Sequence, residues 1–492
     1  MENSIPIHLQ EIIFATSDSA LNRQLSKLEK EGQIKKIAPR IYTSNFDEAE
    51  ELIIRRNIFT ILGKLYPGSV LSHRSALEFK PTAANQIFVT YTYTKKIELP
   101  GITIRFMEGK PAIDGDNPFS GELFVAQQER AFLENLQTSR QVGPTSKTIT
   151  LPEIETKLEQ IVQVKGEEGL NKFRDKTREI AIKLGMQTEF DKLNKLISAL
   201  LTTKPSKILT SPLAMARALG NPYDKHRLEL FEKLFVALQQ PYKDRKDINT
   251  DTIAFRNFAF FEAYFSNYIE GTIFEIEEAK SIIQTETPIP NRDEDSHDIL
   301  GTYKLVSNQK EMQTTPSNPD ELLNILQYRH QILLAARTSK KPGQFKDKNN
   351  RAGETHFVDH TLVRGTLIKG FDYYQALKEP FAKAAYIMFM ISEIHPFLDG
   401  NGRIARVMMN AELVKANQTR IIIPTVYRDD YLGALRRLTR NENPAVYIRM
   451  LQRAQEFSAT LVANEMAIIE NNLNQSNAFK EHDETKLKII TS

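Results

Sequence analysis

The chain has no cysteine among its 492 residues. It therefore has no disulfide, no thiolate nucleophile and no cysteine-based zinc site, a composition that suits a reducing cytoplasm. It also lacks any apolar run approaching the roughly 20 residues that cross a membrane. Residues 1–10 lack the basic and apolar segments of a secretory signal. We therefore expect a cytoplasmic protein without membrane contact.

An excess of charge of one sign is missing as well. The chain has 65 Lys and Arg against 62 Asp and Glu, which gives a net charge of +3. Overall charge therefore does not indicate nucleic acid or membranes, and only local clusters can. The hydrophobic content of 41% is sufficient for several cores. The length predicts about three or four domains of ~150 residues each.

The most informative stretch runs from His395 to Arg406, with the sequence HPFLDGNGRIAR. It lies between two apolar segments, 381–394 and 404–416, which we predict to be buried helices. The glycines on either side of Asn401 permit positive φ, so that consecutive N–H groups can converge on an anion at the helix N-terminus. Arg403 and Arg406 are on one helix face, where two cations repel unless a polyanion lies between them.

Two other side chains of this stretch suit nucleotide chemistry. Asp399 is a hard oxygen ligand, suited to Mg²⁺ that is held jointly with phosphates. His395 has an ordinary pKa near neutrality and can take a proton from a nucleophile. The alternative is a surface turn that His395 caps, which an isolated histidine would favour. The combination instead predicts a nucleotide site.

This stretch resembles the signature His-x-Phe-x-Asp/Glu-Gly-Asn-Gly-Arg-x-x-Arg of the Fic (Fic/Doc) family at every fixed position. The resemblance implies an all-α helical domain with a β-hairpin flap, which transfers AMP from ATP to a Ser, Thr or Tyr hydroxyl of a target protein. It implies His395 as the base and Asp399 as the metal ligand. The ATP-binding residues would be Gly400, Asn401 (backbone and side chain), Gly402, Arg403, Arg406 and Tyr431. Core packing is the alternative for Tyr431.

A second segment, Ser266 to Gly271, ends a helix that we predict over residues 252–269. Glu270 follows Ser266 by one turn and shares its face. By itself this is an ordinary helix C-terminus. It also resembles the inhibitory Ser/Thr-x-x-x-Glu-Gly/Asn motif of Fic proteins, in which the glutamate pairs with the second arginine, here Arg406. The resemblance implies autoinhibition by Glu270 with Ser266, and some relatives are thought also to remove AMP.

Residues 348–362 are polar and β-prone. A turn is predicted at 351–353, followed by a strand over 355–358. The segment resembles the Fic flap, a hairpin that pairs with an extended target segment. The resemblance implies that Thr355, His356 and Phe357 dock the target. His356 and His360 beside Asp359 could also suggest a metal, but a flap surface explains them better.

Residues 1–46 predict a winged helix-turn-helix. The pattern is a short helix at 9–13, a capping turn at 16–19, an amphipathic helix at 20–31 and a basic hairpin at 34–43. In such a module the second helix enters the major groove of DNA. The predicted DNA contacts are Arg23, Lys27, Lys30, Lys35, Lys36 and Arg40. The alternative is a packing module whose basic residues are merely solvated.

Residues 47–143 predict a small α+β unit, with strands at 87–90 and 102–106. Its Ser72-His73-Arg74-Ser75-Ala76-Leu77, with the winged helix, resembles the N-terminal half of abortive-infection antitoxins. We interpret His73 as a satisfied buried histidine and Arg74 as structural or phosphate-contacting. The remaining predicted domains are a helical connector at 144–205, a Fic-type catalytic domain at 206–460 and a polar C-terminal tail at 461–492.

Together these patterns predict a multidomain, mainly α protein, with an α+β winged-helix region before the Fic-type domain. The predicted function is a protein adenylyltransferase that uses ATP and Mg²⁺. The alternative is a DNA-binding regulator whose Fic domain mainly senses nucleotide or modifies itself. The predicted partners are a target protein and ATP, with DNA and a second copy of the chain as further candidates.

Overall fold

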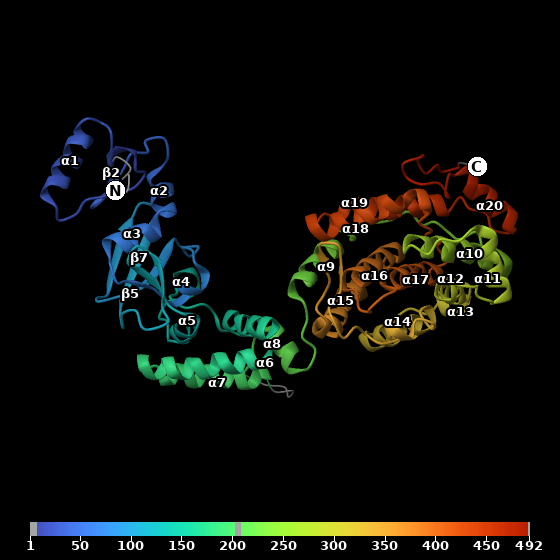
Figure 1. The fold of residues 1–492 in the computed structure, drawn as a ribbon, viewed down its shortest axis with the longest axis horizontal. Coiled ribbons are helices and arrows are strands. Elements are labelled where there is room, and N and C mark those ends of the chain that lie inside the picture. The colour runs from blue at the N-terminus through green and yellow to red at the C-terminus, as the bar shows by residue number, and fades with distance from the viewer. Residues whose placement is uncertain (1–6, 202–207, 491–492) are drawn as a thin grey trace. The chain divides into compact units, whose positions relative to one another are not determined.

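The computed structural model describes residues 7–201 and 208–490. The chain divides into two compact units, Met1–Leu219 and Gly220–Ser492 (Figure 1). The first unit contains both strands and helices, whereas the second is almost entirely helical. A separate β-rich region therefore precedes a helical one, as the sequence predicts.

The beginning of the first unit is one helix beside a small sheet. Its elements are η1 (Ile7–Leu9), β1 (Ile13–Phe14), α1 (Ser19–Lys30), β2 (Lys35–Ala38) and β3 (Ile41–Thr43). The strands are antiparallel in the order β1-β3-β2. Asp18 caps α1 by accepting the N–H of Ala20.

The short helix predicted over residues 9–13 is wrong. A 3₁₀ turn spans only Ile7–Leu9, and Ile13 and Phe14 pair with β3 opposite Tyr42 and Ile41. Strand pairing and burial of Ile13 outweigh the local helical preference. The described part of residues 1–46 therefore contains a single α-helix.

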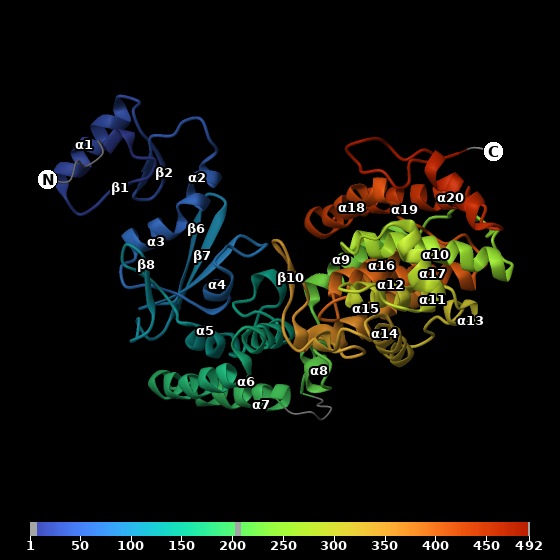
Figure 2. The same cartoon turned by 45° about the vertical axis from the view of Figure 1, so that its right-hand side comes forward.

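The centre of the first unit is a six-stranded mixed sheet in the order β6-β7-β5-β4-β9-β8 (Figure 2). The strands are β4 (Val70–Leu71), β5 (Gln86–Tyr91), β6 (Lys95–Leu99), β7 (Ile102–Glu108), β8 (Asn117–Ser120) and β9 (Leu123–Val125). The accompanying helices are α2 (Glu50–Arg56), α3 (Ile58–Leu65), α4 (His73–Glu78) and α5 (Gln128–Asn135). The two predicted strands lie within β5 and β7.

Three helices follow in the same unit: α6 (Leu151–Leu184), α7 (Gln187–Leu201) and α8 (Pro212–Ala218), after the short turn η2 (Gly143–Thr145). A break at Gly166, with φ of +69°, divides α6. Ala214 and Ala218 of α8 join the core of α6 and α7. The unit consequently extends to Leu219, past the predicted domain boundary at residue 206.

The second unit is built around α16 (Pro380–Ile394) and α17 (Asn401–Lys415), which are almost completely buried (Figure 1). The helices before them are α9 (Lys225–Ala237), α10 (Thr252–Ile269), α11 (Ile276–Thr285), α12 (Asp293–Val306), α13 (Gln309–Met312), α14 (Pro319–Leu333), η3 (Thr338–Lys340), η4 (His360–Leu362) and α15 (Val363–Ala376). Those after them are η5 (Thr425–Tyr427), α18 (Arg428–Asn441), α19 (Pro444–Ser458) and α20 (Met466–Gln475). Two short strands, β10 (Arg351–Ala352) and β11 (Thr355–His356), form a hairpin.

The predicted polar tail at 461–492 is instead part of this unit up to the last described residue, 490. Leu461, Ile469, Leu473 and Leu487 are buried in the main core. Ile469 and Leu473 are one turn apart on α20, and this narrow apolar stripe is hidden in an otherwise polar composition.

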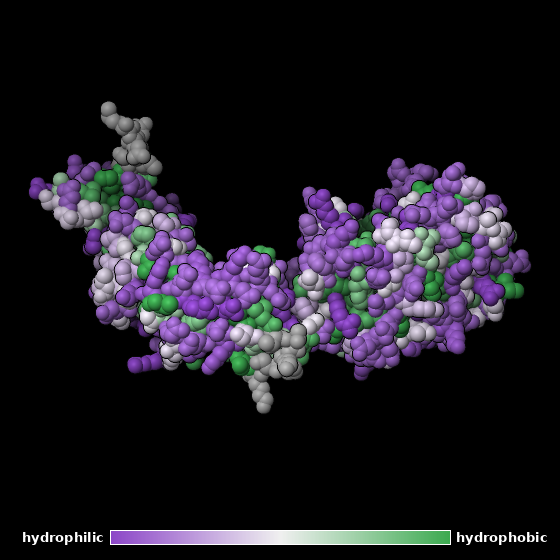
Figure 3. All heavy atoms as spheres, turned by 60° about the horizontal axis from the view of Figure 1, so that its bottom comes forward, coloured by the Kyte–Doolittle hydropathy of each residue, from purple (hydrophilic) through white to green (hydrophobic). Residues whose placement is uncertain are grey.

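Hydrophilic side chains cover most of the face shown in Figure 3, and apolar residues form only small patches on it. Within residues 7–201 and 208–490, no helix is both long and apolar enough to cross a membrane.

Candidate active site

The motif forms the loop between α16 and α17, as predicted. His395 ends α16 with φ of +53°, and its N–H donates to the carbonyl of Ile391 at 2.9 Å. Gly400 has φ of +71° and precedes α17, which begins at Asn401, earlier than the sequence predicts. Gly402 lies inside the helix, so of the two glycines of the motif only Gly400 has a positive φ.

Gly402 leaves room for a neighbouring side chain. A Cβ at this position would lie 2.2 Å from Oε1 of Glu270, far inside van der Waals contact. The absence of a side chain therefore lets the glutamate of α10 approach the first turn of α17. The N–H groups of that turn have no partner within the helix and favour an anion.

The Asn401 side chain differs from the prediction that it faces an anion. Its Oδ1 accepts the N–H of Phe397 at 2.8 Å, and its Nδ2 donates to the Phe397 carbonyl at 2.9 Å. The carboxamide is buried and both of its ends are used within the loop. It consequently holds the loop in shape.

The tautomer of His395 follows from its surroundings. Nδ1 lies 2.8 Å from the carbonyl oxygen of Ser392, which can only accept, so Nδ1 carries the hydrogen. Nε2 is then the unprotonated nitrogen. Burial lowers the pKa of His395 to about 4, so the ring is neutral near pH 7. The ring also stacks on Phe357 at 3.6 Å between centroids.

Arg406 is fully engaged. Its Nε donates to the Ser266 hydroxyl at 3.0 Å, and its Nη2 donates to the Ser266 carbonyl at 2.8 Å. The same Nη2 pairs with Glu270 at 2.7 Å, and Nη1 contacts the Tyr431 hydroxyl at 3.3 Å. The predicted pairing of Glu270 with Arg406 is thus present. Tyr431 is buried, as core packing requires, and is also a partner of this arginine.

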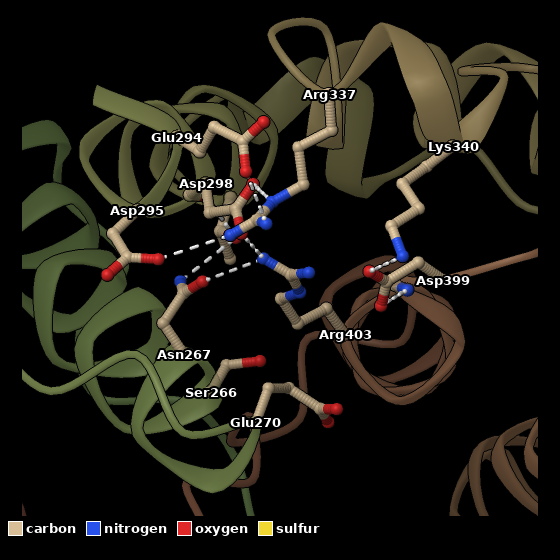
Figure 4. A network of polar contacts seen from close by, with 12 residues as sticks. Ser266, Asn267, Glu270, Glu294, Asp295, Asp298, Arg337, Lys340, Asp399 and Arg403 are labelled. Carbon is tan, nitrogen blue, oxygen red and sulfur yellow. Dashed lines mark hydrogen bonds and ion pairs between the residues drawn. The ribbon is translucent and has the colours of Figure 1, made fainter. Parts of the chain in front are cut away.

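Arg403 is held along one edge only. Its Nη1 pairs with Asp298 at 2.6 Å and donates to Oδ1 of Asn267 at 3.2 Å (Figure 4). Its Nε is buried without a hydrogen-bond partner. In the part of the chain that the structure describes, Nη2 also has none. The two arginines of the motif therefore differ. Each guanidinium nitrogen of Arg406 has a partner, whereas among the described residues Nε and Nη2 of Arg403 have none.

Asp298 is the centre of an ion network that the motif does not predict (Figure 4). Its buried carboxylate pairs with both Arg403 and Arg337, the latter at 2.8 Å. Arg337 also contacts Glu294 and Asp295, which lie on the same helix as Asp298. No local pattern marks Asp298, because α12 and α17 meet only in the folded chain. A polar residue on a buried helix face is the one available signal.

Asp399 is half-exposed beside this network. Its Oδ1 accepts the N–H of Gly400 at 2.7 Å, and its Oδ2 lies 3.7 Å from the Lys340 ammonium (Figure 4). Within the described ranges, no cluster of three or more acidic or histidine ligands could hold a metal alone. A single carboxylate fits Mg²⁺ that is bound mainly through phosphates and water.

His330, which the sequence did not single out, fastens the same loop. Its Nδ1 accepts the N–H of Gly343 at 2.9 Å, so its Nε2 donates to the Asp399 carbonyl at 3.0 Å. The ring stacks on Phe397 at 3.7 Å between centroids. Burial lowers the pKa of His330 to about 4, so it is neutral near pH 7.

The predicted hairpin is present, although its second strand is shorter than expected. Ala352 pairs with Thr355 and Arg351 with His356 across a turn at Gly353. Phe357 leaves the strand and covers the ring of His395. Thr355 and His356 therefore precede the ring that covers the candidate base, on a partly exposed hairpin.

The predicted DNA contacts are only partly brought together. Arg23, Lys27 and Lys30 are exposed on α1, and Lys36 is exposed on β2. Lys35 lies over the ring of Phe46, and Arg40 donates to the carbonyl of Ala15. The exposed basic side chains consequently lie mainly on α1, with Lys36 on β2 and Arg40 just after it.

The site thus combines a neutral histidine with an arginine that keeps an unpaired donor at a helix N-terminus, an arrangement that favours an anion. Residues 320–413 match the model of the Fic/DOC family, and we call this matched region the Fic/DOC domain. That range includes His395, Asp399 and both arginines, but not Glu270.

Curated relatives support the same domain. The protein adenylyltransferase Fic of Drosophila persimilis is 27% identical over 188 residues, which is 36% of this chain and 36% of that protein. The protein of the same name from Culex quinquefasciatus is 27% identical over 180 residues, 35% of each chain. This chain thus spans about a third of the length of the relatives that it matches.

Solved structures show a weaker likeness. A Fic domain containing signaling protein from Bacteroides thetaiotaomicron is 19% identical, with 49% of this chain and 96% of that chain covered and a TM-score of 0.38. Fic-1 from C. elegans is 15% identical, with coverages of 67% and 89% and a TM-score of 0.36. The domain assignment rests on the family match and not on these superpositions.

Proposed function

We propose that this protein transfers AMP from ATP to a Ser, Thr or Tyr hydroxyl of a target protein, and that Glu270 restrains the reaction. The observation that carries the proposal is the state of His395. Its ring is neutral, its Nδ1 is bound to a carbonyl, and its Nε2 is free to accept a proton. The names of the curated relatives support the same activity.

In the proposed reaction, the hydroxyl oxygen of the target bonds to the α-phosphorus of ATP while Nε2 of His395 takes the hydroxyl proton. The bond from the α-phosphorus to its bridging oxygen breaks, and pyrophosphate leaves. The unpaired Nη2 of Arg403 and the first N–H groups of α17 stabilise the charge that develops on the phosphates. The hairpin β10–β11 orients the target segment beside His395.

Asp399 is the residue that would hold Mg²⁺, together with the phosphates of ATP. When bound, the ion would neutralise charge on those phosphates. Lys340, whose ammonium lies 3.7 Å from Asp399, adds positive charge there.

Restraint follows from the engagement of Arg406. Its Nε donates to Ser266 and its Nη2 donates to Glu270. These two donors would otherwise be available to a phosphate. ATP that binds without Arg406 is not aligned for attack at the α-phosphorus. Reversal of the reaction, with removal of AMP, belongs to the same proposal because it would use the same groups.

The test is incorporation of label from α-labelled ATP into a mixture of cellular proteins, followed by mass spectrometry of the modified side chains. We expect His395→Ala to abolish incorporation but to keep ATP binding, since the base acts on the target. Equal incorporation by wild type and His395→Ala would refute the role of His395.

A second candidate function is DNA binding by the first unit. The observation that favours it is the exposed face of α1, on which Arg23, Lys27 and Lys30 lie at helical spacing. In this alternative the Fic/DOC domain senses nucleotide or modifies its own chain. DNA binding without transfer to any other protein would favour it.

A further inference from the structure

The motif Ser72-His73-Arg74 has no part in the proposed reaction, but it fastens a distant loop of the first unit. The buried ring of His73 donates from Nε2 to Oε1 of Gln137 at 3.0 Å. Arg74 donates from Nη1 to the Gly143 carbonyl at 3.1 Å, and its backbone N–H donates to the Lys147 carbonyl at 3.0 Å. Loop 137–147 is therefore held at both ends by the start of α4.

This loop lies against a face of the six-stranded sheet. Lys96 of β6 pairs in register with Arg105 of β7, which pairs in turn with Phe88 of β5. Residues opposite one another on adjacent strands share a face, so these side chains form one row across the sheet. The row and the loop together line a hollow of about 550 Å³.

The lining of this hollow, which we name the basic cleft, is positively charged. Its basic residues are Lys95, Lys96, Arg105, Arg140 and Lys147, and none of its lining residues is acidic. Among the described residues, Lys95, Arg105 and Arg140 have no ion pair, whereas Lys96 pairs with the exposed Glu98 at 2.5 Å. Burial lowers the pKa of Lys147, whose ammonium donates to Gln137.

The remaining lining residues are three apolar side chains, Phe88, Phe106 and Met107, and five uncharged polar ones that can contact an anion. They include the hydroxyl or amide side chains of Thr94, Thr138, Ser139, Gln141 and Thr145. Unpaired cations around one hollow repel each other and attract an anionic ligand. Arginine forks match phosphate oxygens in particular. The volume lies within the range typical of ligand sites.

We propose that the basic cleft binds a ligand with several phosphate groups. Its two candidate sources are consecutive phosphates of a single-stranded nucleic acid and a free polyphosphate. The cleft is distinct from the exposed face of α1, because none of its lining residues belongs to that helix. It is also independent of the reaction proposed for the Fic/DOC domain.

The test uses the full chain and two probes. One is a labelled oligothymidylate of about 12 nucleotides, a length that single-strand sites cover; the other is inorganic tripolyphosphate. The cleft variant is Arg105→Gln/Arg140→Gln. The matched control is Lys64→Gln/Lys80→Gln, which removes the same charge from exposed positions outside the cleft. Circular dichroism verifies folding, and Arg140→Gln alone, at an exposed position, replaces the double variant if that variant unfolds.

We expect the cleft variant to bind at least one probe about tenfold more weakly. For the oligothymidylate, the slope of log affinity against log salt should become shallower by about 0.7 for each phosphate that the variant no longer neutralises. The control should bind as wild type does. The probe whose binding weakens shows whether the ligand is a single-stranded nucleic acid or a free polyphosphate.

The Fic/DOC domain can also bind phosphates, so a second measurement must report on the cleft itself. Bound probe should slow amide hydrogen exchange in loop 137–147, which lines the cleft and lies outside the Fic/DOC domain. Equal binding by cleft variant and control, or no protection of that loop, would overturn the proposal.

Discussion

At the scale of single residues, the two arginines of α17 are in different states. Arg406 donates to Ser266, Glu270 and Tyr431, whereas Arg403 is held along one edge by Asp298 and keeps free donors. An oriented donor without a partner can bind a phosphate oxygen, whereas a donor that already binds a carboxylate cannot. The difference leads to opposite predictions for the two carboxylates.

Glu270→Gly should raise AMP incorporation well above that of wild type. The change frees Nη2 of Arg406 for the γ-phosphate, and ATP can then take the aligned position. Initial rates with α-labelled ATP measure the effect. The control is Glu270→Gly/Arg406→Ala, which also removes the phosphate contact. If Glu270→Gly is no faster than wild type, Glu270 only ends the helix.

Asp298→Asn should have the reverse effect, with weaker ATP binding and slower transfer. Without the shared carboxylate charge, Arg403 and Arg337 repel each other and Arg403 loses its orientation. Breaking a buried ion pair also typically lowers the free energy of unfolding by about 3–5 kcal/mol.

Calorimetric titration with a non-hydrolysable ATP analogue measures the ATP affinity of Asp298→Asn. The matched control is Asp295→Asn. Asp295 is more exposed than Asp298 and pairs with Arg337 but not with Arg403. A rate increase like that of Glu270→Gly would mean that Asp298 restrains Arg403 instead of positioning it.

The pH dependence follows from His395 and its low pKa of about 4. The base should remain unprotonated down to about pH 5, so transfer should not decline around the ordinary histidine pKa of about 6.5. Below that value the unfolded chain binds a proton that folded His395 does not. The free energy of unfolding therefore falls as the pH drops from about 6.5 towards 4.

Urea unfolding at about pH 7 and about pH 5 tests this linkage. His395→Asn should lose less stability than wild type over that interval, because it no longer carries the buried histidine. His356→Asn, at an exposed position, is the control and should behave as wild type does. A transfer rate that declines with a midpoint near 6.5 would contradict the low pKa of His395.

At the scale of elements, the hairpin β10–β11 is connected to the base through Phe357, whose ring covers His395. Phe357→Ala should reduce transfer to a target about tenfold or more and leave ATP binding intact, because loss of the ring misplaces His395 and the docking strand. Kinetics at varied target and varied ATP concentrations separate the two effects. Lys348→Ala, at an exposed position before the hairpin, is the control; a rise in the KM for ATP alone would contradict the assignment.

At the scale of the whole molecule, two units with separate cores allow separate activities. The exposed face of α1 should bind duplex DNA weakly, with a slope of log affinity against log salt of about −0.9 per phosphate contacted. Lys27→Glu/Lys30→Glu should abolish this binding without changing AMP incorporation. Lys64→Glu/Lys80→Glu is the charge-matched control. Affinity that is independent of salt would leave α1 only a packing role.

Prediction from sequence was accurate where the signal is local. The loop between two buried helices follows from apolar periodicity and from the position of Gly400. The common face of Ser266 and Glu270 follows from helical spacing. It failed where distant parts of the chain compete with local preference, as in β1 and in the buried stripe of α20. The chemical roles of His395, Asp399 and the hairpin remain predictions.

The sequence by itself determined which chemical groups stand at the end of α16 and the start of α17, because a short motif brings them together at one loop. Only the tertiary structure decided which donors remain free. Asp298 and Asn267 come from other helices to hold Arg403, and Glu270 reaches Arg406 over Gly402. The basic cleft likewise depends on contacts between a loop and a sheet. Such contacts depend on how the elements pack, and neighbouring residues in the chain do not encode them.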